Sequence, residues 1–285
     1  MRISHNLTAM NTYRQYNTNT VNTNKSMEKL SSGARINRAA DDAAGLSISE
    51  KMRSQIRGLT QATRNAQDGI SFIQTAEGAL NEVSDMLVRL KELATQVKNG
   101  TYSDDDGKNI GAEMKSLGNA IGDIYGKTKF NGQTVFGATA SFVTDGAITA
   151  GGTAAAIKYG EDGGQTVTIA GATVTALNSL IAETSGANAS ITDAQSVTDD
   201  LVEAAITEVN KTRADYGAQQ NQLEHASNNM AATKENLQAA ESRVRDVDMA
   251  DEMMNYTKNN ILLQAAQAML AQANSQPQGI LQLLQ

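Results

Sequence analysis

Several residue types are absent or rare in this 285-residue chain, and each absence excludes a class of protein. Because there is no cysteine, the chain has no disulfide framework and no thiolate for catalysis or metal binding. There is no tryptophan, and aromatic residues make up only 4%, which is too few to fill a thick globular core. Average usage would give about 14 prolines, whereas Pro277 is the only one. A chain with so few helix breakers is free to be very helical.

The charge balance and the apolar runs exclude two further kinds of partner. Acidic residues outnumber basic ones, 31 against 24, so the basic surface that nucleic acids require is missing. The most apolar stretch, 261–273, is interrupted by three glutamines and is shorter than the ~20 residues that cross a bilayer. The N-terminus holds one arginine and lacks the apolar run of a secretory signal peptide. We therefore expect no nucleic-acid or membrane partner, and a soluble intracellular chain unless a leaderless route exports it.

The most informative pattern is a strict seven-residue repeat in the C-terminal half. Such a repeat is typical of helices that supercoil around partners. The second position of each repeat, which would also face a partner helix, is mostly polar. The helix, predicted over 197–247, therefore carries only a narrow apolar stripe. It needs several neighbours, from its own chain or from other copies. The repeat consists of Val202, Val209, Tyr216, Leu223, Met230, Leu237 and Val244.

An upstream segment matches this helix in length. Apolar residues alternate steps of four and three from Met52 to Leu80 and continue, after a phase slip, from Val83 to Val97. The pattern predicts a helix over 46–98 that ends at Asn99-Gly100. A shorter helix over 110–124 and a turn at Asn131-Gly132 follow.

The ends of the chain repeat this symmetry, with weaker helical patterns over 3–30 and 249–270. The order is short helix, long helix, middle, long helix, short helix. The fold class that we predict is mainly α: a long antiparallel helical rod, like a coiled-coil bundle, with a small β-hairpin insertion at its tip. Pro277 is expected just past the last helix.

The middle of the chain, 138–190, differs in composition from the rest. Ala, Thr and Gly supply 30 of its 53 residues. Short β-type runs alternate with turn clusters, which predicts hairpins. The runs lie at 141–143, 157–159, 166–169 and 173–174. The predicted domains are therefore 1–40 plus 250–285, 41–137 plus 191–249, and this small variable insertion.

Motifs that would carry chemistry are missing from the sequence. His5 and His225 stand in no ligand spacing, and there is no phosphate-binding loop or nucleophile elbow. The acidic run 104–106 lacks the spacing of a calcium loop and is interpreted as a helix start. The clusters 41–42 and 246–252 lie beside arginines and are interpreted as salt-bridged helix ends. We expect no enzyme, no metal and no cofactor.

The two ends of the chain carry a different signal. Four large aliphatic residues occupy 280–284, and the helix over 3–30 has Asn and Thr on its outer faces. An apolar tail of this kind needs something to cover it, and such helices gain little until they pack on copies of themselves. The residues expected to form this assembly interface are Leu7, Met10, Val21, Leu262, Met269, Leu270, Leu281, Leu283 and Leu284.

Three stretches, 33–49 (GARINRAADDAAGLSIS), 240–248 (AESRVRDVD) and 271–279 (AQANSQPQG), resemble the signatures of bacterial flagellin. The resemblance covers about 1–137 and 194–285. It implies a compact flagellin that polymerises into the hollow flagellar filament, with the terminal helices as the inner tube and the long helices as the outer tube. It also implies export in an unfolded state through the flagellar type III apparatus, without a cleaved signal peptide. Its partners would be copies of itself, an export chaperone, and cap and hook-associated proteins.

A second implication of the resemblance concerns the innate immune Toll-like receptor that recognises many flagellins. The stretch 87–96 matches the recognised segment on the first long helix, and 111–114 matches the second piece. The corresponding positions are Arg89, Leu93 and Glu113. These residues could equally be ordinary outer-tube interface residues, and both roles can share a face.

Two other functions compete with a filament subunit. A hook–filament junction protein shares the N-terminal character, although the Gln-rich C-terminal end fits flagellin better. A secreted coiled-coil adhesin or effector would need a receptor-binding or catalytic module in the middle, where only the small-residue segment occurs. An enzyme ranks behind both.

Overall fold

The computed structural model describes residues 6–99, 101–136, 155–158, 166–169, 175–186 and 191–283. They divide into two compact units: unit 1 comprises Met1–Ile56 and Glu235–Gln285, and unit 2 comprises Arg57–Lys234. The elements, in chain order, are α1 (Leu7–Ser32), α2 (Ala43–Val97), α3 (Asp104–Lys127), β1 (Lys129–Phe130), β2 (Gln133–Thr134), β3 (Ala155–Lys158), β4 (Thr166–Ile169), α4 (Thr175–Gly186), α5 (Ile191–Ser196), α6 (Asp199–Arg245) and α7 (Met249–Leu283). The mainly α fold is confirmed, and every predicted helix is present.

The predicted apolar stripe of α2 forms most of the core of unit 2. From Leu80 to Val97 its apolar positions are at most 1% exposed, with the phase slip at Val83 included. The heptad positions of α6 face the same core, since Val202, Tyr216 and Leu223 are also at most 1% exposed. The two patterns therefore identified the buried face of each long helix.

Ion pairs fix the direction of α2 against α6 within unit 2. Lys91 Nζ lies 3.3 Å from Glu203 Oε2, and Lys98 Nζ lies 2.8 Å from Asp199 Oδ2. The residue number of the α6 partner falls as that of the α2 residue rises, so the two helices are antiparallel here.

The start of α3 explains the acidic run at 104–106. Ser103 is the N-cap, and it exchanges hydrogen bonds with Asp106 in a capping box. The three exposed aspartates occupy the first turn, where the helix dipole favours negative charge. The interpretation as a helix start is confirmed.

Two short hairpins follow. Asn131 (φ 50°) and Gly132 (φ 81°) form the predicted turn between β1 and β2, since both adopt positive φ. Strands β3 and β4 pair antiparallel from Ala155↔Ile169 to Lys158↔Thr166, which confirms the hairpin between the runs at 157–159 and 166–169. The runs at 141–143 and 173–174 lie outside the described residues.

The predicted β-rich segment also contains a helix, α4, which the composition hid. Leu177, Leu180, Ile181 and Thr184 are buried at helical spacing along it. Three successive backbone N–H groups at 175–177 donate to the carboxylate of Glu208 on α6 over 3.0–3.3 Å. This carboxylate satisfies the open N–H groups of the helix start, so α4 is fixed to α6.

The position expected for Pro277 was wrong. Helix α7 does not end before this residue but continues through it to Leu283. The predicted division into three domains stays a prediction: 1–40 and 250–285 both lie inside unit 1, while 41–137 with 191–249 is shared between the units.

Candidate functional site

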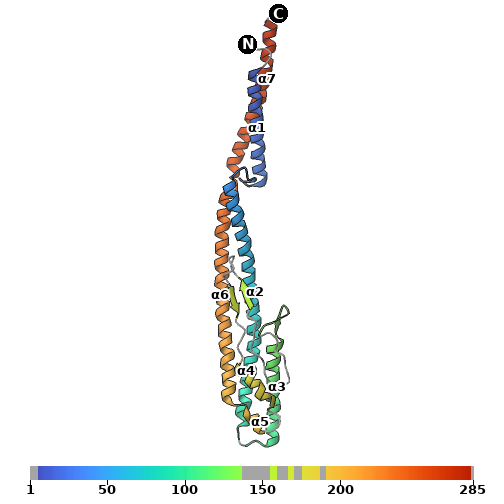
Figure 1. Ribbon diagram of the computed structural model, residues 1–285, viewed down its shortest axis with the longest axis vertical. Helices are drawn as coiled ribbons and strands as arrows, with labels where there is room; N and C mark the ends of the chain where they lie inside the picture. Colours follow the sequence, from blue (N-terminus) through green and yellow to red (C-terminus); the bar gives the residue numbers. More distant parts are fainter. Residues whose placement is uncertain are drawn as a thin grey trace. The chain divides into compact units, whose positions relative to one another are not determined.

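Helices α1 and α7 form an antiparallel pair in unit 1, in which the start of α1 lies beside the C-terminal part of α7 (Figure 1). The described residues buried in this pair are small or polar. They are Thr23 and Ser26 on α1 and Ala266 and Ala273 on α7. Two helices joined along such a seam bury little apolar area, so the pair has little of its own to hold it together.

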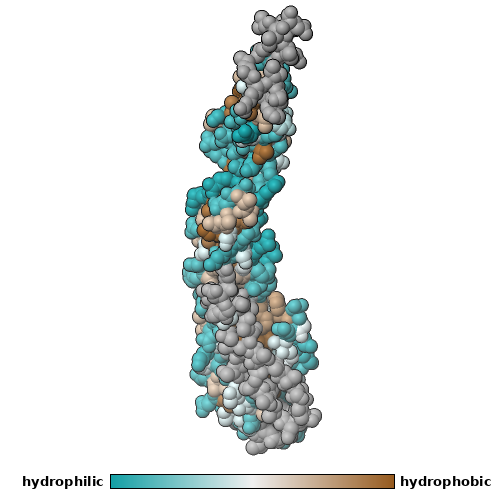
Figure 2. Space-filling view, turned by 45° about the horizontal axis from the view of Figure 1, so that its top comes forward, coloured by the Kyte–Doolittle hydropathy of each residue, from teal (hydrophilic) through white to brown (hydrophobic). Residues whose placement is uncertain are grey.

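Many large apolar side chains of the same pair are exposed. Leu7, Met10 and Val21 on α1 are 61%, 59% and 52% exposed. On α7, Leu262 and Met269 are 42% and 62% exposed. Figure 2 shows apolar patches on an otherwise hydrophilic surface. Burying one such side chain would stabilise an assembly by roughly 1.5–3 kcal/mol, so this surface is suited to bind other helices.

Most of the predicted interface residues can be located in this pair. The five residues above are exposed, and Leu270 is half-buried. Leu281 and Leu283 lie in the last turns of α7, where only the backbone is described, and Leu284 lies outside the described residues. The prediction did not include Tyr13 and Met254, which are likewise apolar and are 55% and 65% exposed. Their spacing gave a signal, because Tyr13 is three residues from Met10 and Met254 follows another methionine.

A link of paired backbone joins the two helix connections of unit 1. Ala34, after α1, forms an antiparallel β-bridge with Asp246, after α6. The N–H of Arg35 donates to the carbonyl of Arg245 at 2.6 Å, and that of Val247 donates to Gly33 at 3.0 Å. Gly33 makes the turn possible because it ends α1 in the left-handed region, at φ 68°. Two signature stretches, 33–49 and 240–248, thus meet in space.

The carboxylates of this link act mainly as caps, which corrects the salt-bridge interpretation. Asp41 accepts the N–H groups of Arg38 and Asn37 at 3.1 and 3.3 Å, and these bonds keep its pKa below the usual value. Asp42 accepts the N–H of Gly45 at 2.9 Å at the start of α2. Asp248 likewise accepts two N–H groups at the start of α7.

The ion pairs of the link use glutamates on the helices instead. Arg38 binds both carboxylate oxygens of Glu28, at 3.0 and 3.1 Å. Arg245 Nη1 lies 2.8 Å from Glu50 Oε1, and this bond is the main reason that the pKa of Glu50 is lowered. These ion pairs connect the loop after α1 with α1 itself, and the end of α6 with α2.

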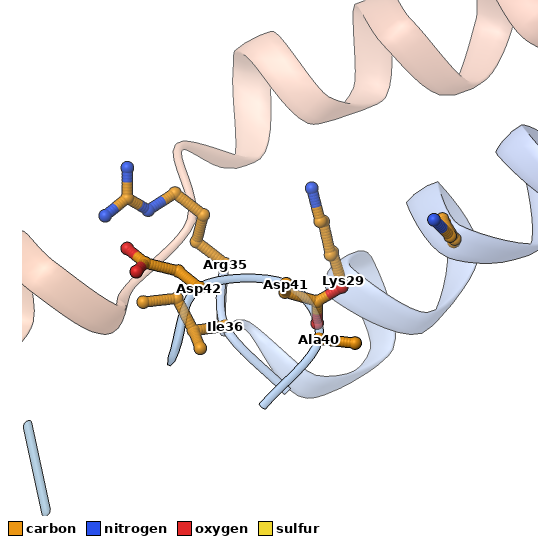
Figure 3. A pocket seen from close by; sticks show the side chains of 7 residues that line it. Lys29, Arg35, Ile36, Ala40, Asp41 and Asp42 are labelled. Atoms are coloured by element: carbon orange, nitrogen blue, oxygen red, sulfur yellow. The ribbon is translucent and has the colours of Figure 1, made fainter. Parts of the chain in front are cut away.

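A hollow of about 400 Å³ lies between the end of α1 and the loop that follows it (Figure 3). Lys25, Lys29 and Arg35 contribute cationic side chains to its lining, together with Asp41 and Asp42. The hollow is partly open to solvent, and its lining combines cationic and anionic side chains.

The predicted receptor residues lie in unit 2. The guanidinium of Arg89 donates to Glu113 Oε1 at 2.9–3.0 Å and to Glu92 Oε2 at 2.9 Å. Bonds to Glu92 and then to Glu113 raise the pKa of Arg89, so it stays cationic. Leu93 is 1% exposed. Arg89 and Glu113 therefore form one exposed polar cluster, whereas Leu93 packs beneath the surface.

Two further observations concern the described part of the chain. Within it, no group of three or more His, Asp or Glu side chains is arranged to hold a metal ion. No helix there combines the length and the apolarity that crossing a membrane requires. His225 is exposed on α6, and His5 lies outside the described residues.

The comparisons of the sequence with protein families and with known proteins agree on one family. The bacterial flagellin N-terminal helical region matches residues 3–141, and the corresponding C-terminal helical region matches 200–284. Flagellins of Halalkalibacterium halodurans and Bacillus subtilis are 48% and 46% identical to this chain, over the full length of both partners in each comparison. A putative flagellar hook-associated protein from Vibrio parahaemolyticus has a similar fold, with a TM-score of 0.57 at 16% identity over 72% of this chain and all of that one.

Proposed function

This chain belongs to the bacterial flagellin family, and from that premise we propose that it polymerises through α1 and α7 into the hollow filament of the flagellum. The observation that carries the proposal is the inverted arrangement of this helix pair, small residues inside and large apolar residues outside. A surface of this kind becomes stable when copies of the same helices cover it. Repeated head-to-tail contacts then build a helical filament.

The role is structural and the destination is extracellular. Flagellins are structural proteins, and we assign no catalysis to this chain. We infer that it leaves the cell unfolded through the flagellar type III apparatus, with a chaperone on its C-terminal segment and a cap protein at the growing end. The small seam between α1 and α7 supports this route, because a pair that buries little apolar area is easily unfolded.

Seeded polymerisation of the purified chain tests the proposal. The wild-type chain should grow filaments of uniform width with a central channel, visible by electron microscopy. Met269→Glu places a charge on the outward face of α7 and should abolish growth or slow it at least ten-fold, because burying an unpaired charge costs several kcal/mol. Asn119→Glu, on an exposed position of α3, is the matched control and should polymerise normally. A wild-type chain that stays monomeric in the presence of filament seeds would refute the proposal.

A second function, recognition by an innate immune Toll-like receptor, is favoured by the polar cluster around Arg89. Arg89 and Glu113 are both exposed and already aligned, so they can contact a receptor without rearrangement. Leu93 would support them from beneath, since its side chain is buried.

Substitution of Arg89 separates this role from a purely structural one. Arg89→Ala should reduce receptor activation by the monomer about ten-fold or more while leaving its melting temperature within a few degrees, because exposed ion pairs contribute little to the stability of a fold. Arg64→Ala, at an exposed position of the same helix, should change neither quantity. An unchanged receptor response would leave Arg89 as a filament contact only.

The junction-protein alternative rests on likeness of fold alone. The similar hook-associated structure shares 16% of its residues with this chain, against 46–48% for the two flagellins.

A further inference from the structure

The proline inside α7 leaves one carbonyl of that helix without its usual donor. In an α-helix the carbonyl of residue i accepts the N–H of residue i+4, and proline has no N–H. Helix α7 runs from Met249 to Leu283, so Pro277 removes the bond that Ala273 would receive. Ala273 is only 8% exposed. A buried carbonyl that lacks a donor is costly, and water has little access to this one.

A side chain from the other end of the chain supplies the missing donor. Asn6 Nδ2 donates to the carbonyl of Ala273 at 2.8 Å. The same carboxamide is the N-cap of α1, where its Oδ1 accepts the N–H of Ala9 at 3.1 Å and the hydroxyl of Thr8 at 2.6 Å. An amide has a donor end and an acceptor end, and Asn6 uses one on each helix.

This bond can select one alignment of the two helices. Carbonyls in the middle of a regular helix already accept a backbone N–H, so they offer little to an additional donor. Pro277 makes Ala273 the exception. If α1 slid by one turn along α7, about 5.4 Å, Asn6 would meet a carbonyl that is already satisfied, and Ala273 would be left without a donor.

We propose that Asn6 and Pro277 together set the register of α1 on α7, with Asn6 as the positioning residue and Pro277 as the residue that creates its acceptor. The small seam of this pair makes such a device necessary. Thr23, Ser26, Ala266 and Ala273 are alike in size and would pack almost equally well after a shift. A single directional bond distinguishes the correct alignment from its neighbours, and it does so beside the segment that continues to Leu283.

A double-mutant cycle on the full chain tests whether Asn6 and Pro277 set the register. Asn6→Ser keeps an effective N-cap but shortens the side chain, so the bond to Ala273 is lost. Pro277→Ala restores the backbone N–H that Ala273 lacks. Wild type, both single variants and the double variant are compared by amide hydrogen exchange at 7–10 and 278–283, in filaments and in the depolymerised chain.

Exchange at 278–283 in filaments should rise about five-fold in Asn6→Ser, which corresponds to about 1 kcal/mol for one hydrogen bond. In the Pro277→Ala background the same substitution should raise exchange less than two-fold, because the carbonyl has regained its donor. Asn17→Ser, an exposed asparagine of α1, is the control and should have no effect in either background.

Equal effects of Asn6→Ser in the two backgrounds, or no effect in either, would overturn the proposal that Asn6 and Pro277 set the register. Normal filaments in all variants together with absent coupling would refute this inference alone. Failure of the wild-type chain to polymerise would instead refute the proposed function, and the cycle would then be decided on exchange in the depolymerised chain.

Discussion

Tyr216 is the largest fully buried side chain of the heptad line on α6. It is 1% exposed, and among the described residues its hydroxyl has no hydrogen-bond partner. Burial disfavours the phenolate and raises the pKa of Tyr216 to about 12, above the ordinary value of 10.0. The folded chain therefore keeps a proton that the unfolded chain releases above pH 10, so this group weakens the fold as the pH rises from 10 towards 12.

Tyr216→Phe should remove the cost of burying an unpaired hydroxyl and also the loss of stability above pH 10. We expect the variant to be about 1 kcal/mol more stable than wild type at pH 7, because an unpaired buried hydroxyl is no longer desolvated. The advantage should grow between pH 10 and pH 11. Thermal unfolding followed by circular dichroism at these pH values measures it. The control Tyr13→Phe, at an exposed position of α1, should be neutral throughout. A loss of stability in Tyr216→Phe at pH 7 would show that the hydroxyl has a partner.

At the scale of single residues the sequence predicts burial better than bonding. The seven-residue repeat placed Tyr216 in the core because a strict period admits one buried face. The sequence could not show that Asp41 and Asp42 cap backbone groups, since a carboxylate beside arginines fits a salt bridge equally well. The choice depends on the turn that begins at Gly33, which closes only when α1 and α6 have ended beside each other.

At the scale of elements, α4 packs on α3 where Gly118 faces Thr184. A Cβ atom at position 118 would overlap Thr184 Oγ1 and lie 2.9 Å from Thr184 Cβ. Gly118 and Thr184 are both buried, and close-packed interiors leave few gaps for an added methyl group.

Gly118→Ala should destabilise unit 2 by about 1–2 kcal/mol, because overpacking costs about 1–3 kcal/mol and the better helix propensity of alanine returns up to about 1 kcal/mol. Gly78→Ala, in the middle of α2 with no atom near the added methyl group, is the matched control and should stabilise by up to about 1 kcal/mol. Urea denaturation of each variant provides the measurement. Adding Thr184→Ala to Gly118→Ala should recover part of the loss, and equal behaviour of the two glycine variants would contradict the packing argument.

Long helices were predictable from the sequence, and their exceptions were not. The apolar stripes of α2 and α6 extend over many turns, so a few polar residues at stripe positions, such as Thr63 and Glu77, do not hide them. Helix α4 has only 12 residues within a segment rich in Ala, Thr and Gly, and its pattern of buried residues is correspondingly short. Helix α7 continues through Pro277, and the carbonyl of Ala273 accepts a hydrogen bond from Asn6, 267 residues away in the sequence, which no local rule at the proline could reveal.

At the scale of the whole molecule, the two compact units predict separable effects of a truncation. Residues 275–285 belong to unit 1, and no part of them lies in unit 2. Their loss should therefore remove assembly without unfolding the helices of 57–234.

Deletion of Ser275–Gln285 should abolish seeded filament growth while the thermal transition of unit 2 shifts by less than a few degrees. Electron microscopy and circular dichroism on the same sample test both parts. A tail that was merely frayed would give the opposite result, with normal filaments from the truncated chain. Loss of both helicity and growth would show that the units depend on each other.

The surface that we propose for assembly could be inferred from the sequence only indirectly. The sequence shows apolar residues at the ends without a matching core, which is why Leu7, Met10 and Met269 could be named. The sequence does not show how copies of the chain would cover them in the proposed filament, because that geometry involves several molecules. The link between Ala34 and Asp246 was equally hidden, since contacts here join positions such as Arg35 and Val244, 209 residues apart.

The outward-facing apolar residues of α1 and α7 also have a genetic consequence. A side chain such as Met269, 62% exposed in the single chain, contributes little to the stability of that chain. In the proposed filament its effect would be shared with the neighbouring copies that it contacts. A defective copy would therefore harm intact copies, and a cell that makes both should show the defect although half of its subunits are normal. Changes at these positions are expected to be dominant, whereas changes in the buried core of unit 2 should be recessive, because a chain that fails to fold is absent from the assembly.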